Sequence, residues 1–191
     1  MEKKGLLIVV SGPSGVGKGT VIKQIIDDPE LKLSYSVSMT TREMREGEKE
    51  GVNYYYVTRD QFIHTRNEGG LLEWTEFVGN YYGTPAAEIE RLRREGRNVL
   101  LEIEVEGCMQ VKEKIPDALT IFIVPPSMKE LENRIRGRRS EPEEILQQRL
   151  AKAARELEMS SQYRYVVCND DVDLAADIIR VIIKHHMRKE F

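Results

Sequence analysis

The chain has 191 residues, which is enough for one domain with a sizeable core but short for two independent domains. It is 40% hydrophobic and 32% charged, with a mean hydropathy of -0.46, and this composition excludes both a disordered chain and a membrane-spanning one. A net charge of -3 gives no overall attraction to nucleic acid or to an anionic membrane, so we expect neither as a partner. Two cysteines and an N-terminus without an export signal predict a reducing, cytoplasmic compartment.

Buried strands and helices are expected to alternate along most of the chain. An aliphatic run over 5–10 predicts a strand buried on both faces, and a helical pattern follows over 16–26. Further strands are expected over 98–105, 119–124 and 165–168, with helices over 107–114, 127–136, 143–159 and 174–189. This alternation predicts an α/β fold of three layers with a parallel central sheet.

Two segments depart from the alternation. The stretch from about 34 to 85 is polar, rich in tyrosine and punctuated by glycine, with β-like runs at 54–57 and 71–77, and it predicts an inserted lobe. The stretch from about 126 to 159 carries the basic run "RIRGRR" between two helical patterns, as in a helical lid. One domain over 1–191 is therefore expected, with a core formed by 1–33, 86–125 and 160–191.

The segment "SGPSGVGKGT" directly follows the first expected strand and has the pattern of a phosphate-binding loop. Gly12, Gly17 and Lys18 have the phosphate-loop spacing G-x-x-x-x-G-K, in which backbone N–H groups converge on phosphate oxygens and the lysine reaches the outer phosphates. Gly19 stands where such loops usually have the Ser or Thr that ligates Mg²⁺, and Thr20 lies one place on. The metal ligands therefore stay undefined, and nucleotide phosphates and water are expected to hold the ion.

The segment "SVSMTTREMREGEKEGVNYYYV" combines arginines, hydroxyls and phenols that could grip a phosphate. Taken alone, it could equally be a solvated loop. Glu73 then lies between Leu72 and Trp74, and a carboxylate in such an apolar setting is costly to bury unless a donor meets it.

Together, the segments "SGPSGVGKGT", "SVSMTTREMREGEKEGVNYYYV", "LLEWTEFVGNYYGT", "IVPPSMKELENRIRGRRSEPEEILQQRL" and "VVCNDDVDLA" resemble the guanylate kinase family over nearly the whole chain. The family belongs to the nucleoside monophosphate kinases with a P-loop fold. The resemblance implies a core, a GMP-binding lobe and a lid. It also implies transfer of a phosphoryl group from ATP to GMP, with Mg²⁺, in purine nucleotide metabolism.

Carried over by position, the resemblance also implies the site residues. The residues expected to bind GMP are Ser38, Arg42, Arg45, Tyr54, Glu73, Tyr82, Thr84 and Glu102. The residues expected to bind ATP are Gly12, Pro13, Ser14, Gly15, Val16, Gly17, Lys18, Gly19, Thr20, Arg134, Arg138 and Asn169. The catalytic cations implied are Lys18, Arg45, Arg138 and Arg149. Taken singly, each lid arginine would be an ordinary solvated helix residue.

The chemistry of guanine supports the role of Glu73. Guanine presents N1–H and N2–H₂ as adjacent donors that one carboxylate accepts together, whereas adenine presents an acceptor at N1. Glu102 and Glu104 stand where the family often has aspartates. Glu102 is expected to contact GMP or metal-bound water, although alternating polar residues could also mark a half-exposed strand.

Two other functions fit parts of this pattern. A guanylate-kinase-like domain that only binds proteins would typically lack an intact phosphate loop, which this chain has. A P-loop kinase for another small acceptor would not need Ser38 and Glu73, which suit guanine. The enzyme is the favoured function.

Overall fold

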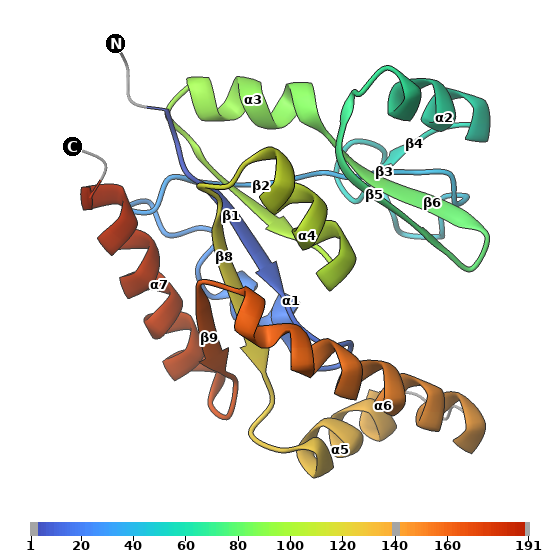
Figure 1. Cartoon of the computed structure of the whole chain (residues 1–191), viewed down its shortest axis with the longest axis vertical. Coiled ribbons are helices and arrows are strands. Elements are labelled where there is room, and N and C mark those ends of the chain that lie inside the picture. Colours follow the sequence, from blue (N-terminus) through green and yellow to red (C-terminus); the bar gives the residue numbers. More distant parts are fainter. Residues whose placement is uncertain (1–3, 139–141, 190–191) are drawn as a thin grey trace.

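A five-stranded parallel sheet forms the centre of the computed structural model, which describes residues 4–138 and 142–189 (Figure 1). Its strand order is β2-β7-β1-β8-β9, and neighbouring strands pair in parallel. Helices cover both faces, so the expected three-layer α/β fold is confirmed.

The strands and helices follow one another closely along the chain. The strands are β1 (Leu7–Ser11), β2 (Leu33–Tyr35), β3 (Met39–Thr40), β4 (Tyr55–Tyr56), β5 (Leu71–Phe77), β6 (Asn80–Pro85), β7 (Asn98–Glu102), β8 (Leu119–Val124) and β9 (Tyr165–Cys168). The helices are α1 (Lys18–Lys23), α2 (Arg59–Asn67), α3 (Ala86–Arg94), α4 (Val105–Lys114), α5 (Met128–Arg138), α6 (Glu143–Glu158), the short 3₁₀ helix Met159–Gln162 and α7 (Val172–Lys189).

The two faces of β1 show how the core is divided. Ile8 and Val10 pack into a cluster with α1, α5, α6 and α7, whereas Leu7 and Val9 point to the opposite face, toward α3 and α4. Both sets are buried, because a parallel strand between two helix layers has no solvated face. The phosphate loop therefore begins at the end of a strand that is fixed on both sides.

The lobe has a sheet and a small core of its own, with strand order β4-β3-β6-β5. Phe62, Leu71 and Tyr81 form that core, and Phe62 comes from α2. Helix α2 was not predicted, because Phe62 and Ile63 are its only apolar residues and give no helical periodicity. The capping box of Thr58 and Gln61 was the available signal.

Several element boundaries differ from those expected, and three of the differences bear on the site. The helix expected over 16–26 is α1 alone, since Gly17 has a left-handed φ of 99° and the chain beyond Lys23 continues in turns. The strand expected over 98–105 ends at Glu102, and Glu104 is already the N-cap of α4. The core sheet also extends to Tyr35 through β2, just past the start of the predicted lobe.

Within residues 4–138 and 142–189, no helix is long and apolar enough to cross a membrane.

Candidate active site

The phosphate loop connects β1 to α1 and leaves no room for side chains at its glycines. Gly12 has a φ of 153°, and a Cβ there would lie 2.4 Å from the carbonyl oxygen of Ile123 on β8. Gly15 and Gly17 also have positive φ values, which favour glycine. The Lys18 ammonium donates to the carbonyl oxygens of Gly12, at 2.6 Å, and Pro13, at 3.4 Å. The loop is thus folded tightly around its lysine.

A cavity of about 610 Å³ opens over this loop. Its lining includes Gly12, Ser14, Gly15, Gly17, Lys18, Gly19, Thr20, Glu102, Glu104 and Glu156. Burial lowers the pKa of Lys18, while the nearby Glu102 carboxylate opposes that shift. An anion that enters the cavity therefore meets a poorly solvated lysine, which an added negative charge would stabilise.

Arg134 and Asn169 donate hydrogen bonds to the backbone of the phosphate loop. The Arg134 guanidinium donates to the carbonyl oxygens of Val16, at 3.2 Å, and Asn169, at 2.9 Å. The Asn169 amide donates to the carbonyl oxygen of Val16 at 2.8 Å, and its side chain is buried. In this conformation both predicted ATP-binding side chains support the loop through these donor groups.

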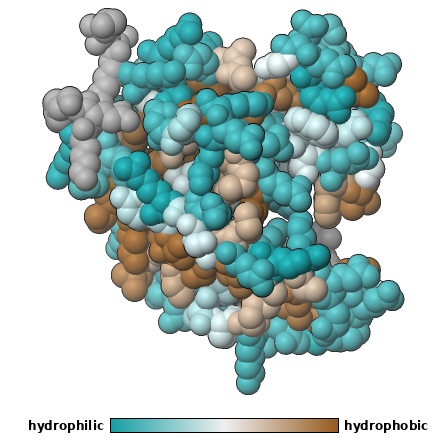
Figure 2. Space-filling model, viewed as in Figure 1, coloured by the Kyte–Doolittle hydropathy of each residue, from teal (hydrophilic) through white to brown (hydrophobic). Residues whose placement is uncertain are grey.

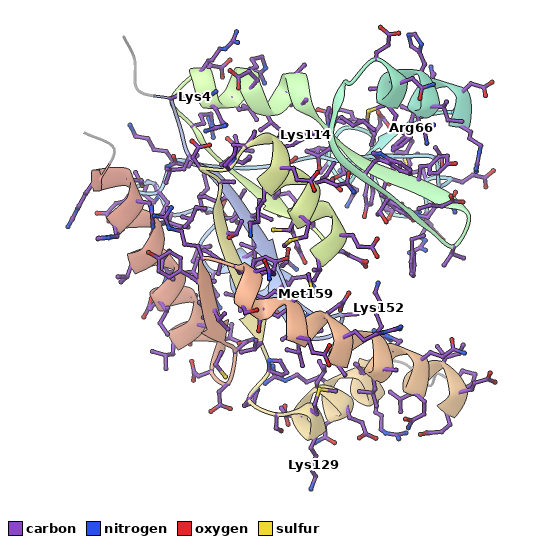
Figure 3. All side chains as sticks on the ribbon, in the orientation of Figure 1. Lys4, Arg66, Lys114, Lys129, Lys152 and Met159 are labelled. Atoms are coloured by element: carbon purple, nitrogen blue, oxygen red, sulfur yellow. The ribbon has the colours of Figure 1, made fainter. Side chains whose placement is uncertain are left out.

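A second predicted arginine of the expected lid, besides Arg134, also reaches the loop. The Arg149 guanidinium on α6 donates to the Ser14 hydroxyl at 2.9 Å, so this arginine already reaches the phosphate loop. The backbone of Arg138 ends α5, and its side chain lies outside the described part of the chain. The sequence analysis missed Lys152, whose ammonium is 2.7 Å from Glu104 and 3.6 Å from Glu156; Figure 3 labels it on α6.

A second cavity, of about 410 Å³, lies between the lobe and the core. The predicted GMP-binding residues that line it are Ser38, Arg42, Arg45, Tyr54, Glu73, Tyr82 and Glu102. They come from the loops around β3, from β5 and β6 and from the end of β7, so folding gathers residues that are far apart in sequence. Figure 2 shows the surface hollowed between the lobe and α6.

Glu48 organises the arginine end of this cavity, and the sequence analysis did not identify it. Its carboxylate pairs with the Arg42 guanidinium at 2.8 Å and accepts from the Arg45 backbone and the Tyr56 hydroxyl. These donors lower the pKa of Glu48 to about 2. Glu48 stays ionised, and it holds the Arg42 guanidinium and the main chain at Arg45 in place before any phosphate arrives.

Glu73 lines the same cavity and is only 4% exposed. Its Oε1 accepts from the hydroxyl of Thr84, which faces it across the antiparallel β5–β6 pair. Burial raises the pKa of Glu73, and the Thr84 hydrogen bond opposes this rise. Thr84 therefore supplies the donor that a buried carboxylate here requires, and it leaves Oε2 for a second partner.

This raised pKa predicts a pH-dependent gain in stability on replacing Glu73 with glutamine. Because the folded protein holds the Glu73 proton more tightly than the unfolded chain, the carboxyl destabilises the fold above its raised pKa and not below its usual value of 4.5. We expect Glu73→Gln to raise the melting temperature by roughly 2–4 °C at pH 8, with the gain narrowing as the pH falls to 4.5. Thermal unfolding followed by circular dichroism at several pH values in this range measures the difference in melting temperature between variant and parent. A difference that does not change with pH would contradict the raised pKa of Glu73.

The two cavities meet at the end of β7. Both are lined by Tyr54, Glu102, Ile103 and Glu104. The Glu102 carboxylate also accepts from the Tyr35 hydroxyl at 2.9 Å, and this bond fixes the carboxylate at the junction. A phosphate held by the phosphate loop and one held by the lobe would therefore face each other across Glu102.

Comparisons with known proteins agree with this arrangement. A family model described as guanylate kinase matches residues 4–186. The crystal structure of guanylate kinase from Anaplasma phagocytophilum is 33% identical, with a TM-score of 0.77, over 98% of this chain and 89% of that one. The crystal structure of an uncharacterized protein from Eubacterium ventriosum ATCC 27560 shares the fold, at 14% identity and a TM-score of 0.53, over 95% of this chain and 99% of that one. The family model spans nearly the whole chain and the solved guanylate kinase is similar over almost its full length, so this chain belongs to the guanylate kinase family.

Proposed function

We propose that the protein transfers the terminal phosphoryl group of ATP to GMP, giving ADP and GDP. The observation that carries this proposal is the junction at Glu102, where the phosphate-loop cavity and the lobe cavity share one wall. Phosphoryl transfer needs donor and acceptor phosphates in line, with positive charge around the moving group. A non-catalytic binding domain would have no use for an intact phosphate loop that opens into this junction.

In the lobe cavity, GMP would lie with its phosphate at the arginine end and its base at Glu73. Arg42 and Arg45, with the phenols of Tyr54 and Tyr82, would hold the phosphate by charge-assisted hydrogen bonds. Glu73 would accept from guanine N1–H and N2–H₂, with Thr84 and Ser38 beside it. An acceptor at N1, as in adenine, would face a carboxylate with nothing to donate.

In the other cavity, the backbone of Gly12 to Thr20 would surround the ATP phosphates, with Lys18 on the outer ones. Arg149 already contacts the loop, and Arg45 approaches from the lobe side. With Arg138 from the lid, these cations would neutralise the charge that spreads over the transferred group.

The residues at the junction fit a magnesium ion that is held chiefly by phosphate oxygens and water. Oε2 of Glu102 lies 3.7 Å from where a Cβ of Gly19 would stand, so the carboxylate is next to the place that a phosphate-loop hydroxyl would occupy. Within the described ranges, no group of three or more His, Cys, Asp or Glu forms a metal site. We infer that Glu102 and Thr20 contact water around Mg²⁺, which supplies charge neutralisation of the ATP phosphates.

Offering different acceptors to the purified protein tests the proposed function. ADP formation from ATP and Mg²⁺, followed in a coupled assay, should proceed with GMP and stay near background with AMP, CMP and UMP. Equal rates with all four acceptors would contradict selection of guanine, and no ADP formation with any of them would contradict the kinase activity.

Because Cys108 and Cys168 are both free, we place this activity in a reducing compartment, the cytoplasm.

We also expect the lobe and lid to close when both substrates bind. Arg42 and Arg45 of the lobe and Arg149 of the lid come from different parts of the fold, yet they must converge on one phosphoryl group and exclude water. Saturating GMP with a non-hydrolysable ATP analogue should reduce the radius of gyration in small-angle scattering and slow amide exchange in both segments. The Lys18→Ala variant with GMP alone is the control, and it should show closure of the lobe only. Scattering of the parent that stays unchanged with both ligands would contradict closure of the lid.

A further inference from the structure

We propose that Gly107, on α4, is the position that sets how deeply the base-reading carboxylate of Glu73 sits, and so determines selection of guanine. The inference rests on the proposed function, because it concerns the same GMP cavity. Gly107 and Glu73 are far apart in sequence, and the packing of α4 against β5 brings them together.

The contact leaves no space for a side chain. A Cβ on Gly107 would lie 2.6 Å from Oε2 of Glu73 and 3.2 Å from its Cδ. Real Cβ atoms are essentially never found so close to another heavy atom, so either the carboxylate or the helix has to move. Gly107 is also buried, and no rearrangement of solvent could relieve the clash.

The helix cannot move away, because two other residues on the same face of α4 tie it to β5. The Gln110 amide accepts from the Trp74 backbone N–H at 3.1 Å and donates to the Trp74 carbonyl at 2.8 Å. One turn further on, the Lys114 ammonium donates to the carbonyl oxygens of Leu71 and Leu72, at 2.9 and 2.8 Å. Figure 3 labels Lys114 at the end of α4.

These ties lie on both sides of Glu73 along β5 and fix its backbone against the helix. Gly107, Gln110 and Lys114 are spaced three and four residues apart, which places them on one stripe of α4. The strand is therefore held by its main chain, and the Glu73 side chain is what must yield to an added methyl group.

Yielding would displace the carboxylate from Thr84 and from the base. Oε1 is held by the Thr84 hydroxyl, so rotation of the carboxylate breaks that bond, and retreat from Gly107 moves Oε2 into the cavity that guanine would occupy. The methyl group costs the fold little, because the carboxylate leaves a place whose burial disfavours its charge, which offsets the lost Thr84 bond, and because alanine favours a helix over glycine. The expected cost therefore falls on guanine recognition.

The test is a cycle of variants at positions 107 and 73. In Gly107→Ala we expect kcat/KM for GMP to fall at least tenfold, mainly because KM for GMP rises. The ratio of kcat/KM for GMP to kcat/KM for AMP should fall as well. The KM for ATP and the melting temperature should stay close to those of the parent. Gly137→Ala is the matched control, because that helical glycine on α5 has no described heavy atom within 4 Å of its ideal Cβ.

Glu73→Ala removes the atoms that the new methyl group would meet, so adding Gly107→Ala to it should change kcat/KM for GMP less than twofold. A tenfold further loss in that double variant would show that Gly107 acts through the helix and would overturn the inference. A parent that prefers GMP, with a Gly107→Ala variant that keeps the same preference, would also overturn it and leave the proposed function standing. A parent with no preference for GMP over AMP would overturn both.

Discussion

Lys18→Ala is expected to lower kcat by about a thousandfold or more while the protein stays folded. The lysine lies in the phosphate-loop cavity, and its burial already disfavours the charged form in the absence of a phosphate. Its hydrogen bonds go to the loop itself, so its removal takes little from the hydrophobic core. Steady-state assays with saturating ATP and GMP measure the loss, and circular dichroism reports the fold.

Lys129→Ala is the matched control for this prediction. Lys129 extends from α5 away from the rest of the molecule, as Figure 3 shows, and it is exposed. The control should keep the parent's turnover. A folded Lys18→Ala protein with near-parental turnover would show that the phosphate loop takes no part in phosphoryl transfer.

Glu73→Gln is expected to lower kcat/KM for GMP by about ten- to a hundredfold, with little change in the KM for ATP. Glutamine keeps the size of the side chain but replaces one acceptor by a donor, which would face guanine N1–H or N2–H₂ across a short gap. An opposed or unpaired buried polar group costs roughly 1–3 kcal/mol, which corresponds to that loss. Discrimination against AMP should weaken, because the amide donates to adenine N1 and its oxygen accepts from the adenine amino group.

Glu76→Gln tests whether the effect belongs to position 73. Glu76 lies on the same strand but is exposed. It should leave the ratio of kcat/KM for GMP and AMP unchanged. If Glu73→Gln also leaves that ratio unchanged, Glu73 does not read the base, even if the protein is a kinase.

Glu73→Gln is therefore expected to have opposite effects on the stability of the fold and on the selection of GMP. The buried carboxylate destabilises the fold at neutral pH, and its replacement is expected to raise the melting temperature, yet that carboxylate is what guanine needs. Such an exchange of stability for function is common at binding sites. Finding both effects in one protein would tie the burial of Glu73 to its role.

Local pattern was enough to predict the central elements of this fold. The strands at 119–124, 165–168 and 71–77 have the expected bounds. The first two are short runs of mainly aliphatic and aromatic residues, which favour a buried strand. The phosphate loop was equally readable, since its glycines are required by backbone geometry that depends on near neighbours.

Contacts between distant parts of the chain were not readable in this way. Nothing near Gly107 in the sequence indicates that Glu73 will lie against it, and Glu48 has no spacing that marks it as the partner of Arg42. The hydrogen bond from the Asn169 side-chain amide to the Val16 carbonyl of the phosphate loop also joins residues that are far apart in sequence. The Gly107–Glu73 and Asn169–Val16 contacts depend on how distant elements pack together, which hydrophobic periodicity does not encode, whereas Glu48 pairs with Arg42 inside one loop.

Following a labelled phosphoryl group shows whether the protein moves it from ATP to GMP. The protein is incubated with Mg²⁺, ATP labelled at its γ-phosphate and equal concentrations of GMP and AMP, and the products are separated by chromatography. We expect the label to appear in GDP, in step with the formation of ADP, and ADP to carry none of it. Label released only as inorganic phosphate, or shared equally between GDP and labelled ADP, would contradict it.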